Sequence, residues 1–352
     1  MALLGPPVVA AGRGWERRTL PPELTTVSDE EAVVFDGVAV HRAEDLEPGR
    51  HHSLAGITFR TLDRPPGARL ATLATVNDAH FGEVECGRLA GVDLGPVLTS
   101  AEGAVPYPRV MNMAAAAEIA AISPDLVVAK GDLTSLGRPA EYQEFEDCYR
   151  TPFGSRLVVT RGNHDNRPAG PAFACDEVQE VRLPGVTVAV LDTSEAGRAG
   201  GRLRPGQLEW LDELGGRAGG PVLVFGHHPC WQDGGDWLDE AAALDRHSSA
   251  RLVEVVARRD ALVGYFAGHT HRFKVRRFPA AAAVPFAEVA CTKDFPGAWA
   301  EYRIYEGGIL QVAHRTSSPG ALAWSERCRD LFGGLYPRYA FGELSDRCFR
   351  VL

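Results

Sequence analysis

The stretch LVGYFAGHTH, residues 262–271, joins a short apolar run to a glycine and two histidines one residue apart. A run this short that contains valine and aromatic residues is typical of a buried strand. His269 and His271 would then lie where that strand ends. A single pair of this kind belongs more often to an exposed strand edge or a hydrogen-bonded core than to a metal site. The role of the two histidines therefore depends on what lies at the ends of the other strands.

Strands and helices alternate along the chain from about Ala68, and this order predicts an α/β layered domain. The predicted strands are residues 69–76, 125–130, 156–160, 186–192, 221–226 and 262–268. The predicted helices are residues 107–123, 139–150, 204–216 and 248–260. After residue 271 the strand-like segments follow one another without helices, which indicates an antiparallel portion that completes the sheet.

A short β-rich segment precedes this domain. Residues 33–62 contain strand-like runs with no helical period, and a Pro-Pro-Gly linker at residues 65–67 separates them from the main part of the chain. We therefore predict a small β-rich appendage over residues 1–66 and a main domain over residues 67–316.

The last part of the chain, residues 317–352, is predicted to be a helix and a docked tail. Ser318 is suited to cap the helix, Pro319 suits its first position, and Gly333 can close it. The residues beyond the helix are too apolar to lie free in water.

The composition excludes several classes of protein. Of 352 residues, 45% are hydrophobic and 24% are charged, as in globular proteins, and the net charge of −9 argues against a nucleic-acid or anionic membrane surface. The seven cysteines form no C-x-x-C pair, which favours reduced thiols. No basic residue precedes the first apolar stretch, and no apolar run approaches the ~18 residues of a membrane helix. We expect a cytoplasmic protein without a signal peptide or a membrane partner.

Nearly every predicted strand of the main domain ends in residues that can ligate a metal ion. Because ligand-binding groups collect at the carboxyl ends of strands in open α/β sheets, these residues should meet in one crevice. Taken singly, each has an ordinary structural explanation, such as a helix cap, a turn or a core histidine. Together these explanations do not account for why such residues recur at the carboxyl end of nearly every strand. The five clusters are Asp78 with His80; Asp132; Asn163 with His164 and Asp165; His227 with His228; and His269 with His271.

A glycine stands just before four of these clusters, at Gly131, Gly162, Gly226 and Gly268. Glycine suits tight turns and backbone conformations that other residues adopt at a cost. These positions indicate that the chain turns sharply as it leaves each strand.

The ordered blocks resemble the five-block signature of the calcineurin-like metallophosphoesterases over roughly residues 70–275. The resemblance implies a four-layer αββα metallophosphoesterase sandwich with a dinuclear metal centre. Matching the blocks implies that one ion is bound by Asp78, His80 and His271 and the other by Asn163, His227 and His269, with Asp132 bridging.

The same resemblance implies that His164 stabilises the transition state or protonates the leaving oxygen. We predict His164 and Asp165 as the catalytic residues, with Asp165 or a backbone carbonyl fixing the tautomer of His164. The Asp-x-His, GNHD and GHTH blocks are most similar to the bacterial cyclic-nucleotide and glycerophosphodiester phosphodiesterase branch. We predict that the substrate is a phosphate ester, specifically a phosphodiester of a small molecule or nucleotide. Carboxylate, amide and imidazole ligands together favour Mn, Fe or Zn as the two divalent ions over Mg or Ca.

Three alternative functions stay open on the sequence: a catalytically silent interaction scaffold, a phosphomonoesterase and a nuclease. The presence of all seven expected ligands favours catalysis. The acidic net charge and the lack of a basic, aromatic-rich track disfavour a nuclease. The oligomeric state is not determined by the sequence.

Two segments are predicted to border the site. Residues 81–108 form a long stretch without clear secondary structure, which we interpret as a flap over the metal ions. Its polar candidates are Glu83, Glu85 and Tyr107, which serve equally well to solvate a loop.

The second segment, residues 291–299, contains Lys293, which is able to contact a phosphate. Arg161 and Arg272 flank ligand blocks and offer the same contact. Flanking arginines are, however, more often ion-pair partners at the surface.

Overall fold

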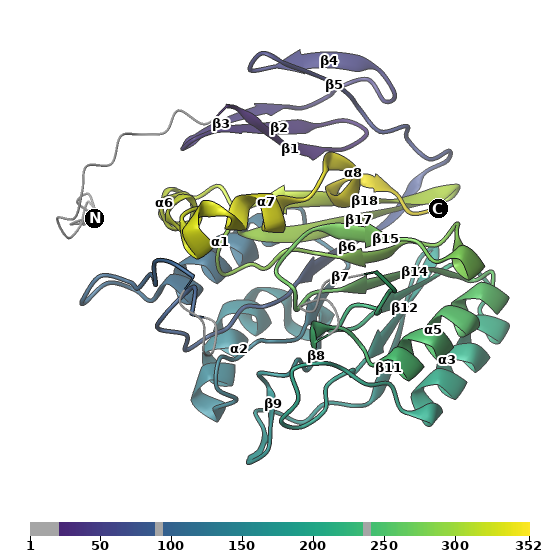
Figure 1. Cartoon of the computed structure of the whole chain (residues 1–352). Coiled ribbons are helices and arrows are strands. Elements are labelled where there is room, and N and C mark those ends of the chain that lie inside the picture. Colours follow the sequence, from purple (N-terminus) through teal and green to yellow (C-terminus); the bar gives the residue numbers. More distant parts are fainter. Residues whose placement is uncertain (1–20, 89–93, 235–240) are drawn as a thin grey trace.

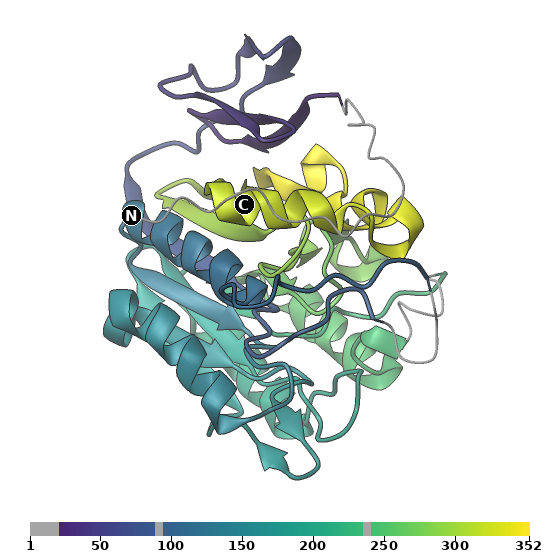
Figure 2. The ribbon, with the colours of Figure 1, turned by 90° about the vertical axis from the view of Figure 1, so that its left-hand side faces the viewer.

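The computed structural model describes residues 21–88, 94–234 and 241–352. Two six-stranded sheets lie face to face, and helices cover their outer faces (Figures 1 and 2). This arrangement confirms the four-layer α/β sandwich. Among the described residues, no helix combines the length and apolar character needed to cross a membrane.

The first sheet has the strand order β19-β18-β17-β6-β7-β8. Its strands are β6 (Arg69–Val76), β7 (Leu126–Lys130), β8 (Leu157–Thr160), β17 (Ala298–Tyr305), β18 (Gly308–Arg315) and β19 (Phe349–Arg350). Strands β6, β7 and β8 are parallel, whereas β17 and β18 run antiparallel to their neighbours. Helices α1 (Tyr107–Ala121) and α2 (Pro139–Phe153) cover this sheet through buried residues such as Ile119 and Phe145.

The second sheet has the strand order β11-β12-β13-β14-β16-β15. Its strands are β11 (Val178–Leu183), β12 (Val186–Leu191), β13 (Val222–Phe225), β14 (Leu262–Ala267), β15 (Lys274–Arg276) and β16 (Phe286–Glu288). Helices α3 (Pro205–Arg217) and α5 (Arg246–Arg258) cover it. Helix α5 begins two residues before the predicted Ser248, because the side chain of Asp245 caps it by accepting from the Ser248 amide.

The segments after residue 271 divide between the two sheets. Strands β17 and β18 complete the first sheet in antiparallel orientation, as predicted. Strand β16 instead runs parallel to β14 in the second sheet, so the prediction of a purely antiparallel portion was wrong there. A two-stranded ribbon, β9 (Asn166–Arg167) with β10 (Gly170–Pro171), lies outside both sheets.

The main core lies between the two sheets. Leu73, Val128 and Tyr302 of the first sheet pack with Phe225 and Phe266 of the second, and all five are fully buried. The central strands are covered on both faces, since helices pack on the other side. This explains why their sequences are continuous apolar runs and do not alternate.

The β-rich appendage consists of a three-stranded antiparallel sheet and a hairpin. Its strands are β1 (Glu23–Val27), β2 (Ala32–Asp36), β3 (Ala39–Ala43), β4 (His51–Leu54) and β5 (Ile57–Arg60). It lies over the C-terminal elements in both views (Figures 1 and 2). Buried Arg303 of β17 joins the two parts, with ion pairs to Asp29 of the appendage at 2.9 Å and to Glu301 at 3.0 Å. Residues 1–20, which bear on a signal peptide, lie outside the described residues.

The C-terminal segment contains α6 (Pro319–Cys328), α7 (Tyr336–Phe341) and α8 (Leu344–Arg347) and returns to the first sheet as β19. Ser318 caps α6, as predicted, by accepting from the Ala321 amide. The helix ends before Gly333, since a short 3₁₀ segment with left-handed backbone at Phe332 and Gly333 comes after it. The limits of the three predicted chain regions stay a prediction.

The described part of the residue 81–108 loop packs beside this tail. Cys86 and Leu98 exchange backbone hydrogen bonds, and Tyr107 stacks on Trp324 of α6 with ring centroids 4.0 Å apart. Tyr107 is buried and therefore belongs to the hydrophobic core. Glu85 is half-exposed and pairs with Arg88 in the solvent. Residues 89–93 of the predicted flap lie outside the described residues.

Candidate metal centre

The five sequence clusters lie in loops that come directly after β6, β7, β8, β13 and β14. Hydrogen bonds join these loops to one another. The His80 amide donates to the Asp132 carbonyl at 2.9 Å, and the His164 amide donates to Asp132 Oδ1 at 2.8 Å. The His269 amide donates to Asp78 Oδ2 at 2.9 Å. The structure thus brings residues far apart in sequence to one edge of the sandwich, as the strand order requires.

Several of the predicted ligands have left-handed backbone, which costs energy in residues other than glycine. Such strain persists only where neighbouring contacts hold the chain, and it gathers at functional sites. These ligands, with φ in parentheses, are Asp78 (52°), His80 (45°), Asp132 (52°), His269 (70°) and His271 (55°).

Asp78, His80 and His271 form what we call the first ligand group. Asp78 Oδ1 lies 3.4 Å from His271 Nε2 and 3.9 Å from His80 Nε2. The Asp78 and His80 side chains are almost fully buried, and that of His271 is 21% exposed. Three potential ligand atoms therefore face one small volume, and together with the carboxylate charge they suit a cation.

We call Asn163, His227 and His269, which the resemblance assigns to the second ion, the second ligand group. His227 Nε2 lies 3.2 Å from His269 Nδ1. The carboxylate of Asp132 lies between the two groups, with Oδ2 3.3 Å from His227 Nε2 and 3.7 Å from His80 Nε2. One carboxylate oxygen is thus close to an imidazole of each group, and this position suits a bridge.

Burial and neighbouring charges together set the protonation states of the ligands. Burial lowers the pKa of His80 and of His269 well below the ordinary value, so both rings are neutral at pH 7. Burial raises the pKa of Asp132, but His227 and His164 lower it more, and this carboxyl stays ionised. Burial lowers the pKa of His227, but Asp132 raises it to about 9. A metal ion would compete with that proton for the imidazole.

Three buried ligand atoms have no hydrogen-bond partner in the described part of the chain. They are Asp78 Oδ1, His80 Nε2 and Asn163 Oδ1. An unpaired buried polar atom costs about 1–3 kcal/mol, so native folds rarely retain several together. Their donor chemistry fits first-row divalent ions.

His227 and His228 are adjacent but differ in what their rings contact. His227 Nδ1 donates to the Lys130 carbonyl at 2.7 Å, which leaves Nε2 facing the centre. Both ring nitrogens of His228 have partners, Thr193 Oγ1 at 2.8 Å and the Ala199 carbonyl at 3.1 Å. His228 lies near His269, yet both of its ring nitrogens are hydrogen-bonded within the protein. We therefore interpret it as a support of the loop that follows β13.

His164 and Asp165 also have separate contacts. His164 Nδ1 donates to the Ser135 carbonyl at 2.6 Å, and its ring centroid lies 4.6 Å from that of His80. Asp165 is buried and accepts from the Gly162 amide at 2.9 Å and from the Thr134 amide at 2.8 Å. Of the two groups that could fix the His164 tautomer, the backbone carbonyl is the one in contact. Asp165 instead ties two ligand loops together.

Two glycines before the ligands are required for different reasons. Gly131 has φ of +86°, which favours glycine. Gly162 has no such angle, but a Cβ there would lie 2.2 Å from Asp132 Oδ1. Close approach of backbone to the proposed bridge therefore explains Gly162, which the sequence alone attributed to a turn.

The cations expected near a phosphate are all engaged in ion pairs. Arg161 Nε donates to Asp192 Oδ2 at 2.8 Å, and Arg272 Nε donates to Glu288 Oε2 at 3.0 Å. Lys293 is 4% exposed and its Nζ lies 2.9 Å from Glu83 Oε2, and its contact with a phosphate stays a prediction.

Sequence reasoning missed Asp294, whose Oδ2 lies 3.5 Å from His271 Nδ1. It stands next to Lys293, but no spacing rule connects it to His271. Only the packing of two loops brings them together.

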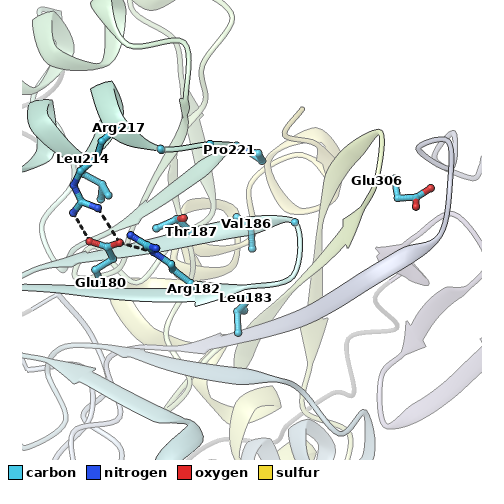
Figure 3. Close-up of a pocket in the computed structure, with 13 residues that line it drawn as sticks. Glu180, Arg182, Leu183, Val186, Thr187, Leu214, Arg217, Pro221 and Glu306 are labelled. Atoms are coloured by element: carbon cyan, nitrogen blue, oxygen red, sulfur yellow. Dashed lines mark hydrogen bonds and ion pairs between the residues drawn. The ribbon is translucent and has the colours of Figure 1, made fainter.

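A polar surface hollow lies away from these residues (Figure 3). It borders Val186 and Pro221, at the amino ends of β12 and β13, whereas the ligands lie beyond carboxyl ends. Three of its charged residues pair with one another, because Arg182, at 3.0 Å, and Arg217 both contact Glu180. The hollow is therefore separate from the candidate metal centre.

Curated proteins that match the chain are bacterial phosphodiesterases. A probable cyclic nucleotide phosphodiesterase of Synechococcus sp. is 31% identical over 155 residues, which is 43% of this chain and 59% of that protein. The glycerophosphodiester phosphodiesterase GpdQ of Enterobacter lignolyticus is 32% identical over 171 residues, 44% of this chain and 59% of that protein. The chain thus spans about three fifths of the length of these relatives.

The fold and the sequence signature agree with one family. A dimetal phosphatase from Danio rerio has a similar fold, with a TM-score of 0.54 and 13% identity over 71% of this chain and 98% of that chain. The family model for the calcineurin-like phosphoesterases matches residues 72–273, more than half of the chain. The chain belongs to the calcineurin-like phosphoesterase family.

Proposed function

We propose that this protein hydrolyses a phosphodiester of a small molecule, with two divalent metal ions as cofactors. The first ligand group would hold one ion, the second ligand group the other, and Asp132 would bridge them. The native ions would be Mn, Fe or Zn, because the ligands combine oxygen with imidazole nitrogen.

The observation that carries this proposal is the set of unpaired buried ligand atoms on Asp78, His80 and Asn163. A hydrogen-bonded core would pair these atoms, and a scaffold that has lost catalysis has no need to keep them unpaired. The complete donor set therefore supports a metal-dependent enzyme over the scaffold.

When bound there, a pair of divalent ions would supply an activated water molecule and positive charge for the phosphoryl oxygens. The chain's own residues would orient the substrate and transfer the proton. His164 is the proposed general acid: with Nδ1 bonded to the Ser135 carbonyl, Nε2 is the nitrogen left to protonate the leaving oxygen. Asp165 would support this role indirectly by holding the loop that carries His164.

The charge around the site favours a diester. A bound phosphodiester carries one negative charge, whereas a monoester dianion usually needs additional cations. Arg161, Arg272 and Lys293 are held by carboxylates, so none of these three is free for a second charge. The names of the relatives, which refer to cyclic nucleotides and glycerophosphodiesters, support the same class.

We expect the protein, stripped of metal and reloaded with Mn²⁺, to hydrolyse bis(p-nitrophenyl) phosphate with a higher kcat/KM than p-nitrophenyl phosphate. Initial rates on both substrates with one protein preparation provide the measurement, and the stripped protein is the control. A preference for the monoester would overturn the diester assignment and leave the metal centre standing. If the Mn²⁺-loaded protein hydrolyses neither ester, the proposal that this chain is a phosphoesterase is wrong.

A further inference from the structure

A buried group of three charges lies directly behind the first ligand group. Lys293 Nζ is 2.9 Å from Glu83 Oε2 and 3.1 Å from Asp294 Oδ2. The exposed fractions of the side chains are 5% for Lys293, 3% for Asp294 and 17% for Glu83. We call Glu83, Lys293 and Asp294 the Lys293 cluster. Burying such charges is costly, and apolar residues would fill the same space more stably.

Each carboxylate of the cluster faces one histidine of the first ligand group. Asp294 Oδ2 lies 3.5 Å from His271 Nδ1, and Glu83 Oε2 lies 3.9 Å from His80 Nδ1. The opposite nitrogen of each ring, Nε2, faces Asp78 Oδ1. Both imidazoles therefore lie between a carboxylate on one side and the proposed metal position on the other.

The surrounding fold fixes the cluster in place. Asp294 Oδ1 accepts from the Tyr336 hydroxyl of α7 at 2.6 Å and from the Cys291 thiol at 2.7 Å. The Trp324 indole of α6 donates to the Lys293 carbonyl at 3.0 Å. The C-terminal helices thus hold the loop that carries Lys293 and Asp294 against the loop that carries Glu83.

We propose that the Lys293 cluster positions His80 and His271 for the first metal ion and so sets the affinity of that site; this rests on the proposed dinuclear centre. The two carboxylates select the ring orientation in which Nε2 points toward the proposed metal position. They also make each imidazole a stronger electron-pair donor to the metal ion. Lys293 keeps both carboxylates in place and separated. These three are positioning residues, since the ion would contact only the histidines.

The test is Mn²⁺ binding to the metal-stripped full chain, measured by calorimetric titration. The variants are Asp294→Asn and Glu83→Gln, which keep the side-chain shape and remove the charge. Glu85→Gln, two residues from Glu83 and half-exposed, is the matched control. Both variants should weaken one of two Mn²⁺ sites by about 10- to 100-fold and leave the other unchanged, whereas the control should bind like the parent.

A second arm assigns the affected site. His271→Ala should remove the first site, and adding Asp294→Asn to it should then change Mn²⁺ binding no further, because both act on one ion. Thermal unfolding shows whether each variant is folded. If Asp294→Asn does not fold, the less buried Glu83→Gln decides the question alone.

The outcomes separate the inference from the function on which it rests. If the parent chain does not bind two Mn²⁺ ions, the proposed dinuclear centre fails. If the parent binds two and the variants match it, or lose both sites equally, the cluster only supports packing and the inference is wrong.

Discussion

Replacing Asp132 by asparagine is expected to empty both metal positions and to lower diesterase activity by at least the ~10²- to 10³-fold that losing one preorganised electrostatic group costs. Asp132 Oδ2 is near ligands of both groups, at 3.3 Å from His227 Nε2 and 3.7 Å from His80 Nε2. Asparagine can still accept the hydrogen bond that the His164 amide gives to Oδ1, so the loops should keep their positions. The loss would come from the missing bridging charge.

The measurement is metal content by mass spectrometry, beside the rate with bis(p-nitrophenyl) phosphate. His271→Ala is the comparison, because it should empty mainly the first position and leave the second partly filled. Asp212→Asn, on the outer helix α3 where Asp212 pairs with Arg259, is the control and should retain both ions. Full metal content and full activity in Asp132→Asn would refute the bridge.

Removing His164 should lower turnover without removing the metal. A general acid contributes roughly 10²- to 10⁴-fold in rate, so His164→Ala should lose about that factor on a phosphodiester with an alkyl leaving group. The loss should be small with bis(p-nitrophenyl) phosphate, since p-nitrophenolate departs without a proton. Metal content and unfolding temperature should stay near those of the parent, because His164 is not a proposed ligand.

Rates on the two substrates, measured side by side, test this. His247→Ala removes an exposed histidine of α5 and should change neither rate. An equal loss on both substrates would make His164 an electrostatic stabiliser of the phosphoryl oxygens. Loss of metal from the variant would make it a ligand.

Much of the fold could be predicted from the sequence because local patterns of apolar and polar residues indicate where strands and helices lie. The apolar runs of β13 and β14 are continuous since both sheet faces are covered, and each run ends where the polarity changes. The side of the sandwich where the clusters meet could be inferred from the common direction of parallel strands.

Features that depend on packing between distant segments could not be predicted. Lys293 is a lysine in a loop by sequence, and only the fold shows that Glu83 and Asp294 enclose it. The end of α6 was misplaced because Gly333 belongs to a separate turn with left-handed Phe332. The sequence left Asp165 and a backbone carbonyl as candidate partners of His164, and no residue type marks the Ser135 carbonyl that makes the contact.

The most direct test of the dinuclear centre is anomalous diffraction from crystals of the full chain grown with Mn²⁺, recorded at the manganese absorption edge. We predict two anomalous peaks about 3.5–4 Å apart, one in the first ligand group and one in the second. The carboxylate of Asp132 should lie between them. A single peak, or a pair of peaks that Asp132 does not join, would contradict the dinuclear centre proposed for this chain.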